Sequence, residues 1–396
     1  MRFLLAPMQF PTEPGRSYLT TELALALTAA GHEVEVLQLD WDAEPAATED
    51  PPRFWKGVRL VRCTPRWVDG FGGLVRHASK FILSARRVGE VAKRRFDLGS
   101  FDVMIAWAPV LAFAPLMRMA RSAGVAHRLL IIWDFFPDHY HQIGRIPAGP
   151  PFWIAKAAEQ RLMQDFTAVL CTLRQNAAYL KSAFKTPAEQ KVLVTPVWSD
   201  VAPVPRSDRA AVRRAHELPE EGPIAVFGGN IVEGRGFGQM LEAAEAGARE
   251  GSTLKFLFVG DGRLAPVVRA AAEINPNVLW RPPMPRDAYL ELLGACEVGL
   301  VATVPGVTSF SIPSKTIDYL RAGLPSVVAI EQGNEFAVML ERYGVARSVP
   351  FGDGLGYFRA AEEMARGPGV AAAAQRCLDE VFHIRHAIST ILEAAA

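Results

Sequence analysis

The stretch RFLLAP, at residues 2–7, opens the chain as an apolar run that ends in proline. The segment Tyr18–Ala30 follows with apolar residues at helical spacing, and Gly31 stops it. A second apolar run, EVEVLQL, occupies residues 33–39. A strand, a helix and a strand in this order predict a parallel sheet with a right-handed crossover. We therefore expect an α/β fold from the first residues onward.

The same pattern restarts in the second half of the chain. Pro223–Phe227 and Leu254–Val259 are predicted strands, and glycines follow both of them. Proline-rich sequence separates the halves, with a boundary near Val201–Ser207. We predict an α/β protein with two doubly wound, parallel-sheet, Rossmann-like domains. The expected domains are residues 1–203 and 204–378, and a helix over 379–396 is expected to pack back toward the first domain.

Composition narrows the functional classes. The 396 residues are 50% hydrophobic and 21% charged, with a net charge of +1, which is ordinary for a globular enzyme and argues against a general nucleic-acid binder. The longest apolar run is broken by prolines and is too short to span a bilayer. The start of the sequence lacks a signal-peptide layout, and four scattered cysteines suit a reducing compartment. We expect a cytoplasmic protein without a metal site.

The stretch Ser309–Gly323 carries the clearest ligand signal. Its Pro313 precedes Ser314, Lys315 and Thr316, and this order is typical of a helix N-terminus. Free amides and the helix dipole at such an end favour phosphate, and Lys315 adds a positive charge. Asp318 offers a carboxylate to sugar hydroxyls one turn later. The structural alternative is an ordinary capped helix with a surface lysine.

Glycines and cations recur at the other strand ends. Gly229 and Gly260 each follow a predicted strand, where glycine lets a phosphate approach the backbone. Arg235 is the cation that follows the first of them. In the first half, Gly15 and Arg16 lie in the loop after the first strand, where parallel sheets bind ligands. A plain tight turn with an exposed arginine is the alternative for this last pair.

A third group of polar residues lies in the predicted loop Asp134–Arg145, after the strand His127–Trp133. Two acids, two histidines, three aromatic residues and an arginine occupy it. Carboxylates and aromatic faces suit sugar binding, and histidine or aspartate can transfer protons. This density favours a functional loop over a structural one.

The segment Arg76–Phe96 is strongly basic. Seven arginines and lysines alternate with apolar residues, and Glu90 is its one acid. Such a helix could lie against anionic lipid headgroups, in which case the protein would associate peripherally with the inner face of the plasma membrane through Arg76–Arg95. The alternative is a solvated helix whose apolar side packs in the core.

Several motifs together resemble the retaining GT-B glycosyltransferases of family four, and most closely the surface-polysaccharide branch that includes the fucosamine transferases. The resemblance covers nearly the whole chain. Its motifs are Phe227-Gly228-Gly229-Asn230, Phe258-Val259-Gly260-Asp261-Gly262, the Arg286–Leu293 helix, Pro313-Ser314-Lys315 with Asp318–Pro325, Trp133-Asp134-Phe135-Phe136-Pro137-Asp138, and Pro196-Val197-Trp198-Ser199-Asp200.

This resemblance implies a GT-B fold, in which two Rossmann-like domains face each other across a cleft. The first domain would bind the acceptor and the second would bind a nucleoside diphosphate sugar, with UDP as the expected nucleotide. Transfer to an acceptor hydroxyl would retain the anomeric configuration and need no metal or other cofactor. The acceptor would be a glycan, a lipid-linked sugar or a small molecule, and no nucleic acid is expected as a partner.

The resemblance also implies roles for individual residues. Asp134 stands near the place of a histidine that many relatives carry, so it is the leading catalytic candidate, followed by Asp138 and His139. The chain also departs from the family at Phe310, which replaces the first of two acidic residues, while Asp318 holds the second. The implied donor contacts are Gly15, Arg16 and Arg235 at the diphosphate, Asn230 in the cleft, Met284 at the base, Ser314, Lys315 and Thr316 at the β-phosphate, and Asp318 at the ribose.

Two other functions stay open on this evidence. One is a nucleotide-sugar epimerase on the same fold, which would release no sugar to an acceptor. The other is a non-catalytic protein that binds the nucleotide sugar, which the replacement at Phe310 keeps open.

Overall fold

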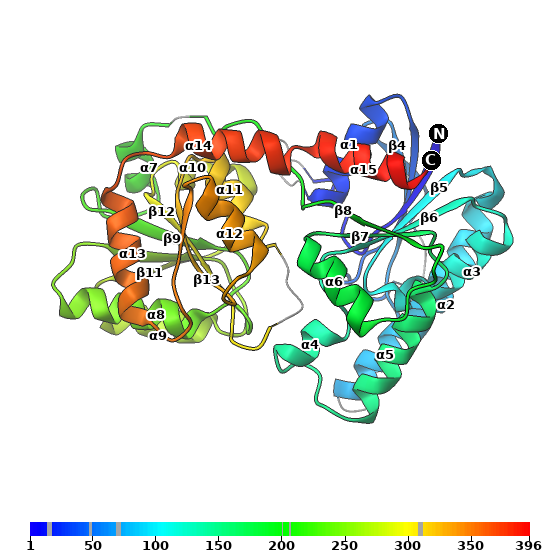
Figure 1. Cartoon of the computed structure of the whole chain (residues 1–396), viewed down its shortest axis with the longest axis horizontal. Coiled ribbons are helices and arrows are strands. Elements are labelled where there is room, and N and C mark those ends of the chain that lie inside the picture. Colours follow the sequence, from blue (N-terminus) through cyan, green and yellow to red (C-terminus); the bar gives the residue numbers. More distant parts are fainter. Residues whose placement is uncertain (14–17, 47–49, 69–72, 200, 206, 308–311) are drawn as a thin grey trace. The chain divides into compact units, whose positions relative to one another are not determined.

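The structure is a computed structural model that describes residues 1–13, 18–46, 50–68, 73–199, 201–205, 207–307 and 312–396. The chain divides into two compact units. The first unit comprises Met1–Trp198 together with Ile384–Ala396, and the second comprises Ser199–His383. Residues 384–396 therefore return to the first unit after the second is complete (Figure 1).

The described part of the first unit contains an eight-stranded sheet in the order β3-β4-β2-β1-β5-β6-β7-β8. Each neighbouring pair is parallel except β3 and β4, which pair antiparallel at one edge. The strands are β1 (Arg2–Ala6), β2 (Glu33–Leu39), β3 (Arg53–Trp55), β4 (Val58–Cys63), β5 (Val103–Trp107), β6 (His127–Ile132), β7 (Ala168–Cys171) and β8 (Lys191–Val194).

Helices cover both faces of this sheet and bury a separate apolar cluster on each. On one face, α1 and α15 contact each other, and Leu23 shares its cluster with Ile391 (Figure 1). The helices of the unit are α1 (Leu19–Ala29), α2 (Gly73–Arg95), α3 (Ala114–Ser122), α4 (Asp138–Gln142), α5 (Pro150–Met163), α6 (Arg174–Ala183) and α15 (Ile384–Ala394), with the 3-10 turns η1 (Leu98–Ser100) and η2 (Val110–Phe113).

The second unit contains a parallel sheet of six described strands in the order β11-β10-β9-β12-β13-β14. The strand order reverses at β9, as it does at β1 in the first unit. The strands are β9 (Ile224–Gly228), β10 (Lys255–Val259), β11 (Val278–Arg281), β12 (Val298–Ala302), β13 (Ser326–Ala329) and β14 (Ala346–Ser348). The helices are α7 (Arg209–Ala215), α8 (Phe237–Arg249), α9 (Ala265–Ile274), α10 (Arg286–Leu293), α11 (Lys315–Arg321), α12 (Glu335–Arg342), α13 (Gly354–Arg366) and α14 (Ala371–Cys377), with the π-helix η3 (Leu378–Phe382).

These two sheets confirm the predicted pair of doubly wound, parallel-sheet domains. One local expectation was wrong: the segment Asp134–Arg145 is not loop throughout, because its middle forms the short helix α4. The reason is visible in the bonding, since His139 and His141 donate their backbone N–H groups to the carbonyls of Phe135 and Pro137.

The basic segment Arg76–Arg95 forms most of α2, and its two halves differ. In the second half, Val88, Val91 and Ala92 are fully buried in the core of the first unit. In the first half, Ile82 is 62% exposed. None of the described helices combines the length and apolarity needed to cross a bilayer.

Candidate functional site

In the second unit, the loops after β9 and β10 meet at the carboxyl edge of the sheet. Gly229 and Gly260 both have positive φ angles, 123° and 144°, which favour glycine. A Cβ atom on Gly260 would lie 2.0 Å from the carbonyl oxygen of Gly229, so only glycine allows this approach. A Cβ on Gly229 would meet nothing within 4 Å. The two loops thus pack tightly on each other while the backbone at Gly229 faces open space.

Two cations lie near this edge. The Lys315 ammonium lies 3.5 Å from the centre of the buried Phe227 ring, at the end of β9. Burial lowers the pKa of Lys315 well below its ordinary value, and the positive charge of Arg235 lowers that pKa further. Among the described residues, no carboxylate forms an ion pair with either side chain. Two like charges in a partly dehydrated place favour the binding of an anion. The negative charge of the anion would offset both the desolvation of Lys315 and its repulsion by Arg235.

The start of α11 supplies one more polar group. Thr316 is fully buried, and its Oγ1 has no hydrogen-bond partner among the described atoms. Ser314 is exposed and its side chain makes no capping bond. Because α11 spans only seven residues, its helix dipole is not used as an argument for an anion site. The anion site rests on the side chains of Lys315, Arg235 and Thr316.

Asp318 is buried, with 7% of its surface exposed, and is held by a residue that sequence reasoning missed. Arg286, the first residue of α10, donates to both carboxylate oxygens, at 2.7 and 3.2 Å. Burial raises the pKa of Asp318, and the adjacent guanidinium opposes that rise. The pair fixes the carboxylate while leaving lone pairs for other donors. A sequence signal existed, because Arg286 opens a predicted helix just after the Met284 loop.

Two tyrosines that were also missed from the sequence pack against the strand ends: Tyr319 is buried, and Tyr289 is half-buried with a buried hydroxyl. The Tyr319 hydroxyl accepts from the backbone N–H of Gly228 at 3.3 Å. A Cβ at Gly228 would lie 2.0 Å from the Tyr289 hydroxyl, and a Cβ at Gly299 would lie 2.2 Å from the Tyr319 ring. Each glycine therefore makes room for one tyrosine, and this packing fixes the end of β9 where Asn230 begins the open loop.

The remaining predicted donor residues are less constrained. Asn230 is exposed, and Met284 is half-buried in the loop between β11 and α10. Gly15, Arg16 and Phe310 lie outside the described residues.

In the first unit, Asp134 and Asp138 have different surroundings. One oxygen of Asp134, Oδ1, is buried without a hydrogen-bond partner in the described structure. Burial and then the charge of Asp134 raise the pKa of Tyr18 to about 12. Asp138 instead accepts two bonds from the Lys156 ammonium, at 2.6 and 2.7 Å, and one from the Tyr179 hydroxyl at 2.8 Å. Asp134 thus has an oxygen available to a ligand, whereas Asp138 anchors α4 to α5 and α6.

The third catalytic candidate, His139, follows Asp138 in α4. Its ring is half-buried and contacts the edge of Tyr140, with centroids 6.2 Å apart. Among the described residues, no group of three or more histidine, cysteine or acidic side chains could hold a metal ion. All four cysteines are buried free thiols.

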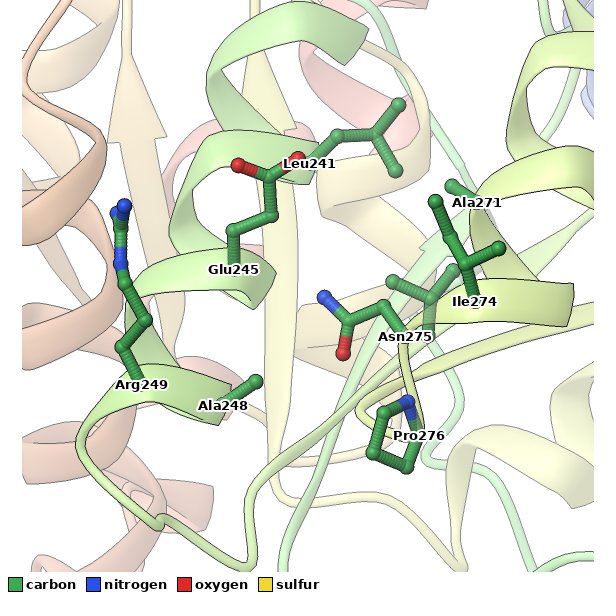
Figure 2. Close-up of a pocket in the computed structure, with 9 residues that line it drawn as sticks. Leu241, Glu245, Ala248, Arg249, Ala271, Ile274, Asn275 and Pro276 are labelled. Carbon is green, nitrogen blue, oxygen red and sulfur yellow. The ribbon is translucent and has the colours of Figure 1, made fainter.

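A surface pocket of about 320 Å³ lies elsewhere in the second unit, between α8, α9 and the start of β11 (Figure 2). Figure 2 shows Glu245 and Arg249 from α8 on one side and Ile274 and Pro276 on the other. The pocket adjoins the amino end of β11 and contains none of the predicted donor residues. It is therefore not the candidate site, since ligands of parallel sheets bind at the carboxyl ends.

Comparison with known proteins agrees with this geometry. Residues 16–198 match a family model described as a glycosyl transferase 4-like domain. The match lies within the first unit, which is therefore similar to a glycosyl transferase 4-like domain.

Similar proteins align with both units. WcaI of Escherichia coli (strain K12), a glycosyl transferase provisionally assigned to colanic acid biosynthesis, is 25% identical over 87% of this chain and 88% of its own. Sucrose-phosphate synthase from Thermosynechococcus elongatus is 15% identical, with a TM-score of 0.69 over 100% of both chains. HepE from Anabaena, in complex with UDP and glucose, is 15% identical, with a TM-score of 0.68 over 99% of this chain and 98% of its own. At these identities the two structures establish the shared fold.

Proposed function

We propose that this chain transfers a sugar from a nucleoside diphosphate sugar to an acceptor hydroxyl, with retention of the anomeric configuration. The observation that carries the proposal is the pair of cations, Lys315 and Arg235, beside the touching glycine loops of the second unit. A diphosphate matches this site in charge, and the open backbone at Gly229 lets its oxygens approach the chain.

The same cations would act in the reaction. As the bond from the sugar to the diphosphate breaks, negative charge grows on the leaving phosphate. Lys315 and Arg235 would stabilise that charge, and Thr316 would donate its otherwise unpartnered hydroxyl. Because the protein supplies two positive charges, we propose that transfer needs no divalent cation, which turnover in the presence of a chelator would test.

The acceptor would bind the first unit near Asp134. Its unpartnered Oδ1 suits a hydrogen bond to the acceptor hydroxyl. No carboxylate of the described residues is assigned as a covalent nucleophile. We therefore propose that the acceptor attacks the face from which the diphosphate departs, with a phosphate oxygen assisting removal of the proton.

UDP is the proposed nucleotide. Two proteins that share the fold are described as bound to UDP and glucose and to UDP-2-fluoro glucose. The ribose hydroxyls would donate to Asp318, which Arg286 holds in place. The similarity to WcaI supports a role in surface polysaccharide synthesis, where the acceptor is a glycan or a lipid-linked sugar.

A nucleotide panel tests the donor site. UDP, GDP, ADP and their sugars are added one at a time, and the rise in melting temperature is measured, since a ligand that binds the folded state stabilises it. We expect UDP to stabilise the protein and Lys315→Met or Arg235→Met to weaken its binding about tenfold or more, the equivalent of one lost charge-assisted hydrogen bond. Arg249→Met, at the opposite end of α8 from Arg235, is the matched control.

Unchanged affinity in both site variants would remove the diphosphate assignment. Turnover then separates the functions: transfer to an acceptor supports the proposal, an altered sugar without an acceptor indicates an epimerase, and binding without either reaction indicates a binding protein.

A further inference from the structure

Helix α5 of the first unit has its charged and apolar residues on unexpected sides. Trp153 and Ile154 are 65% and 70% exposed. Lys156 instead turns inward to the Asp138 carboxylate, and Glu159 is fully buried, accepting from the backbone N–H of Val110 at 2.8 Å. A surface helix in water normally shows the opposite arrangement. The outward side of its first two turns therefore presents apolar side chains where water would favour charged ones.

Two more exposed apolar side chains belong to α2 and the segment before it. Ile82 is 62% exposed and Val68 is 42% exposed. The backbone N–H of Val68 donates to the hydroxyl of Ser79 at 3.1 Å. Since Ser79 and Ile82 are three residues apart, they share one face of α2, and Val68 lies against that face.

Ring contacts connect α2 to the loop that leads into α5. Phe81 of α2 contacts Phe136, and Phe136 contacts Tyr140, with centroids 5.6 Å apart in each pair. The Arg145 guanidinium lies 6.0 Å from the Tyr140 ring. This chain of contacts places the first half of α2 beside the entry to α5.

The charges around these apolar residues are mainly positive. Burial lowers the pKa of Lys80 while the charges of Asp42, Glu44 and Asp40 raise it, and Glu90 lies further along α2. The exposed basic residues of the segment around Val68, of α2, of the loop before α5 and of α5 itself are Arg66, Arg76, Arg86, Lys93, Arg94, Arg95, Arg145 and Arg161. An apolar face with a tryptophan and a basic surround matches an anionic membrane surface in both polarity and charge.

We infer that the outward face of α5, with Ile82 and Val68, docks on an anionic lipid bilayer. Trp153 and Ile154 enter the headgroup boundary, where an amphipathic indole ring is favoured, and the arginines contact lipid phosphates. Ile82 belongs to α2, the basic segment singled out in the sequence, whereas the inserted Trp153 and Ile154 belong to α5. The lipid contact would hold the chain at a membrane face next to lipid-linked acceptors. Binding of the protein to lipid requires neither a bound nucleotide nor a bound acceptor.

Vesicle flotation of the full chain tests the inference. We expect the protein to float with phosphatidylcholine vesicles that contain phosphatidylglycerol and to stay behind with phosphatidylcholine alone. The double variant Trp153→Gln and Ile154→Gln should lower the partition coefficient at least about tenfold, because it removes the inserted apolar groups. The matched control is Phe54→Gln, which replaces a 78% exposed side chain on β3 and should leave flotation unchanged.

Absence of flotation with either vesicle, or equal flotation of the double variant and the parent, would overturn the inference. Sedimentation equilibrium gives a second measurement: a dimer of the parent that the double variant abolishes would assign this face to self-association instead. Thermal stabilisation by UDP, measured on the same proteins, reports the donor site separately, so the membrane inference and the proposed function fail independently.

Discussion

The pair formed by Arg286 and Asp318 allows a quantitative test of the donor site. The perturbation is Arg286→Gln, which removes both hydrogen bonds to the Asp318 carboxylate, at 2.7 and 3.2 Å. The Asp318 side chain is 11% exposed, so water replaces the lost guanidinium only in part. The variant therefore leaves a largely buried charge without its counterion.

The expected cost follows from the burial of the two partners. Removing one partner of a fully buried pair costs about 3–5 kcal/mol of unfolding free energy. The Arg286 side chain keeps 28% of its surface exposed, so solvent screens the pair in part. We therefore expect Arg286→Gln to lower the free energy of unfolding by roughly 1–3 kcal/mol. UDP affinity should fall about tenfold, since a carboxylate without its bidentate partner orients the ribose less well.

The assay is a double-mutant cycle with Arg286→Gln, Asp318→Asn and both together, followed by urea unfolding and by UDP titration. Asp318→Asn removes the buried charge, so the second substitution should cost less in its presence than alone. A coupling free energy of about 1 kcal/mol or more is expected. Additivity of the two single effects, within about 0.5 kcal/mol, would refute the argument, because it would mean that the guanidinium does not compensate the carboxylate.

Two other residues give separate expectations. Asp134→Asn should lower turnover by about a hundredfold or more while UDP affinity stays within twofold, and near-normal turnover would contradict its catalytic role. For Glu159, burial raises the pKa to about 8 from an ordinary 4.5. The folded protein thus keeps a proton that the unfolded chain releases, and stability should fall as pH rises between these values. The Glu159→Gln variant should gain on the parent by up to about 1.4 kcal/mol per pH unit in that window, and parallel pH profiles in urea unfolding would contradict the pKa shift.

Sequence patterns predicted the fold closely where side chains alternate or repeat regularly. The helix expected over Tyr18–Ala30 is α1, Leu19–Ala29, and the strand expected over Leu254–Val259 is β10, Lys255–Val259. Such runs bury one continuous apolar face, so local spacing and final packing agree. The antiparallel edge strand β3 was not predicted, since three residues carry too little periodicity.

The residues of the candidate site could be proposed from the sequence, but the partners of their side chains could not. The glycines and Lys315 were identified because strand ends and helix starts have local signatures. The pairing of Asp138 with Lys156, eighteen residues apart, and that of Asp318 with Arg286, thirty-two apart, depend on which helices pack together. The local sequence around each residue does not specify which helices pack together. For the same reason the inward turn of Lys156, which exposes Trp153, could not be anticipated.

The return of α15 to the first unit has a consequence for biosynthesis. Ala387 and Ile391 complete the apolar cluster that Leu23 and Leu27 begin near the other end of the chain. The ribosome releases residues 384–396 only after the whole second unit has been made. The second unit can therefore reach its final packing first, while one sheet face of the earlier-synthesised unit is covered by α1 but not yet by α15. Nascent chains should thus show their greatest need for chaperone protection on the portion that emerged earliest.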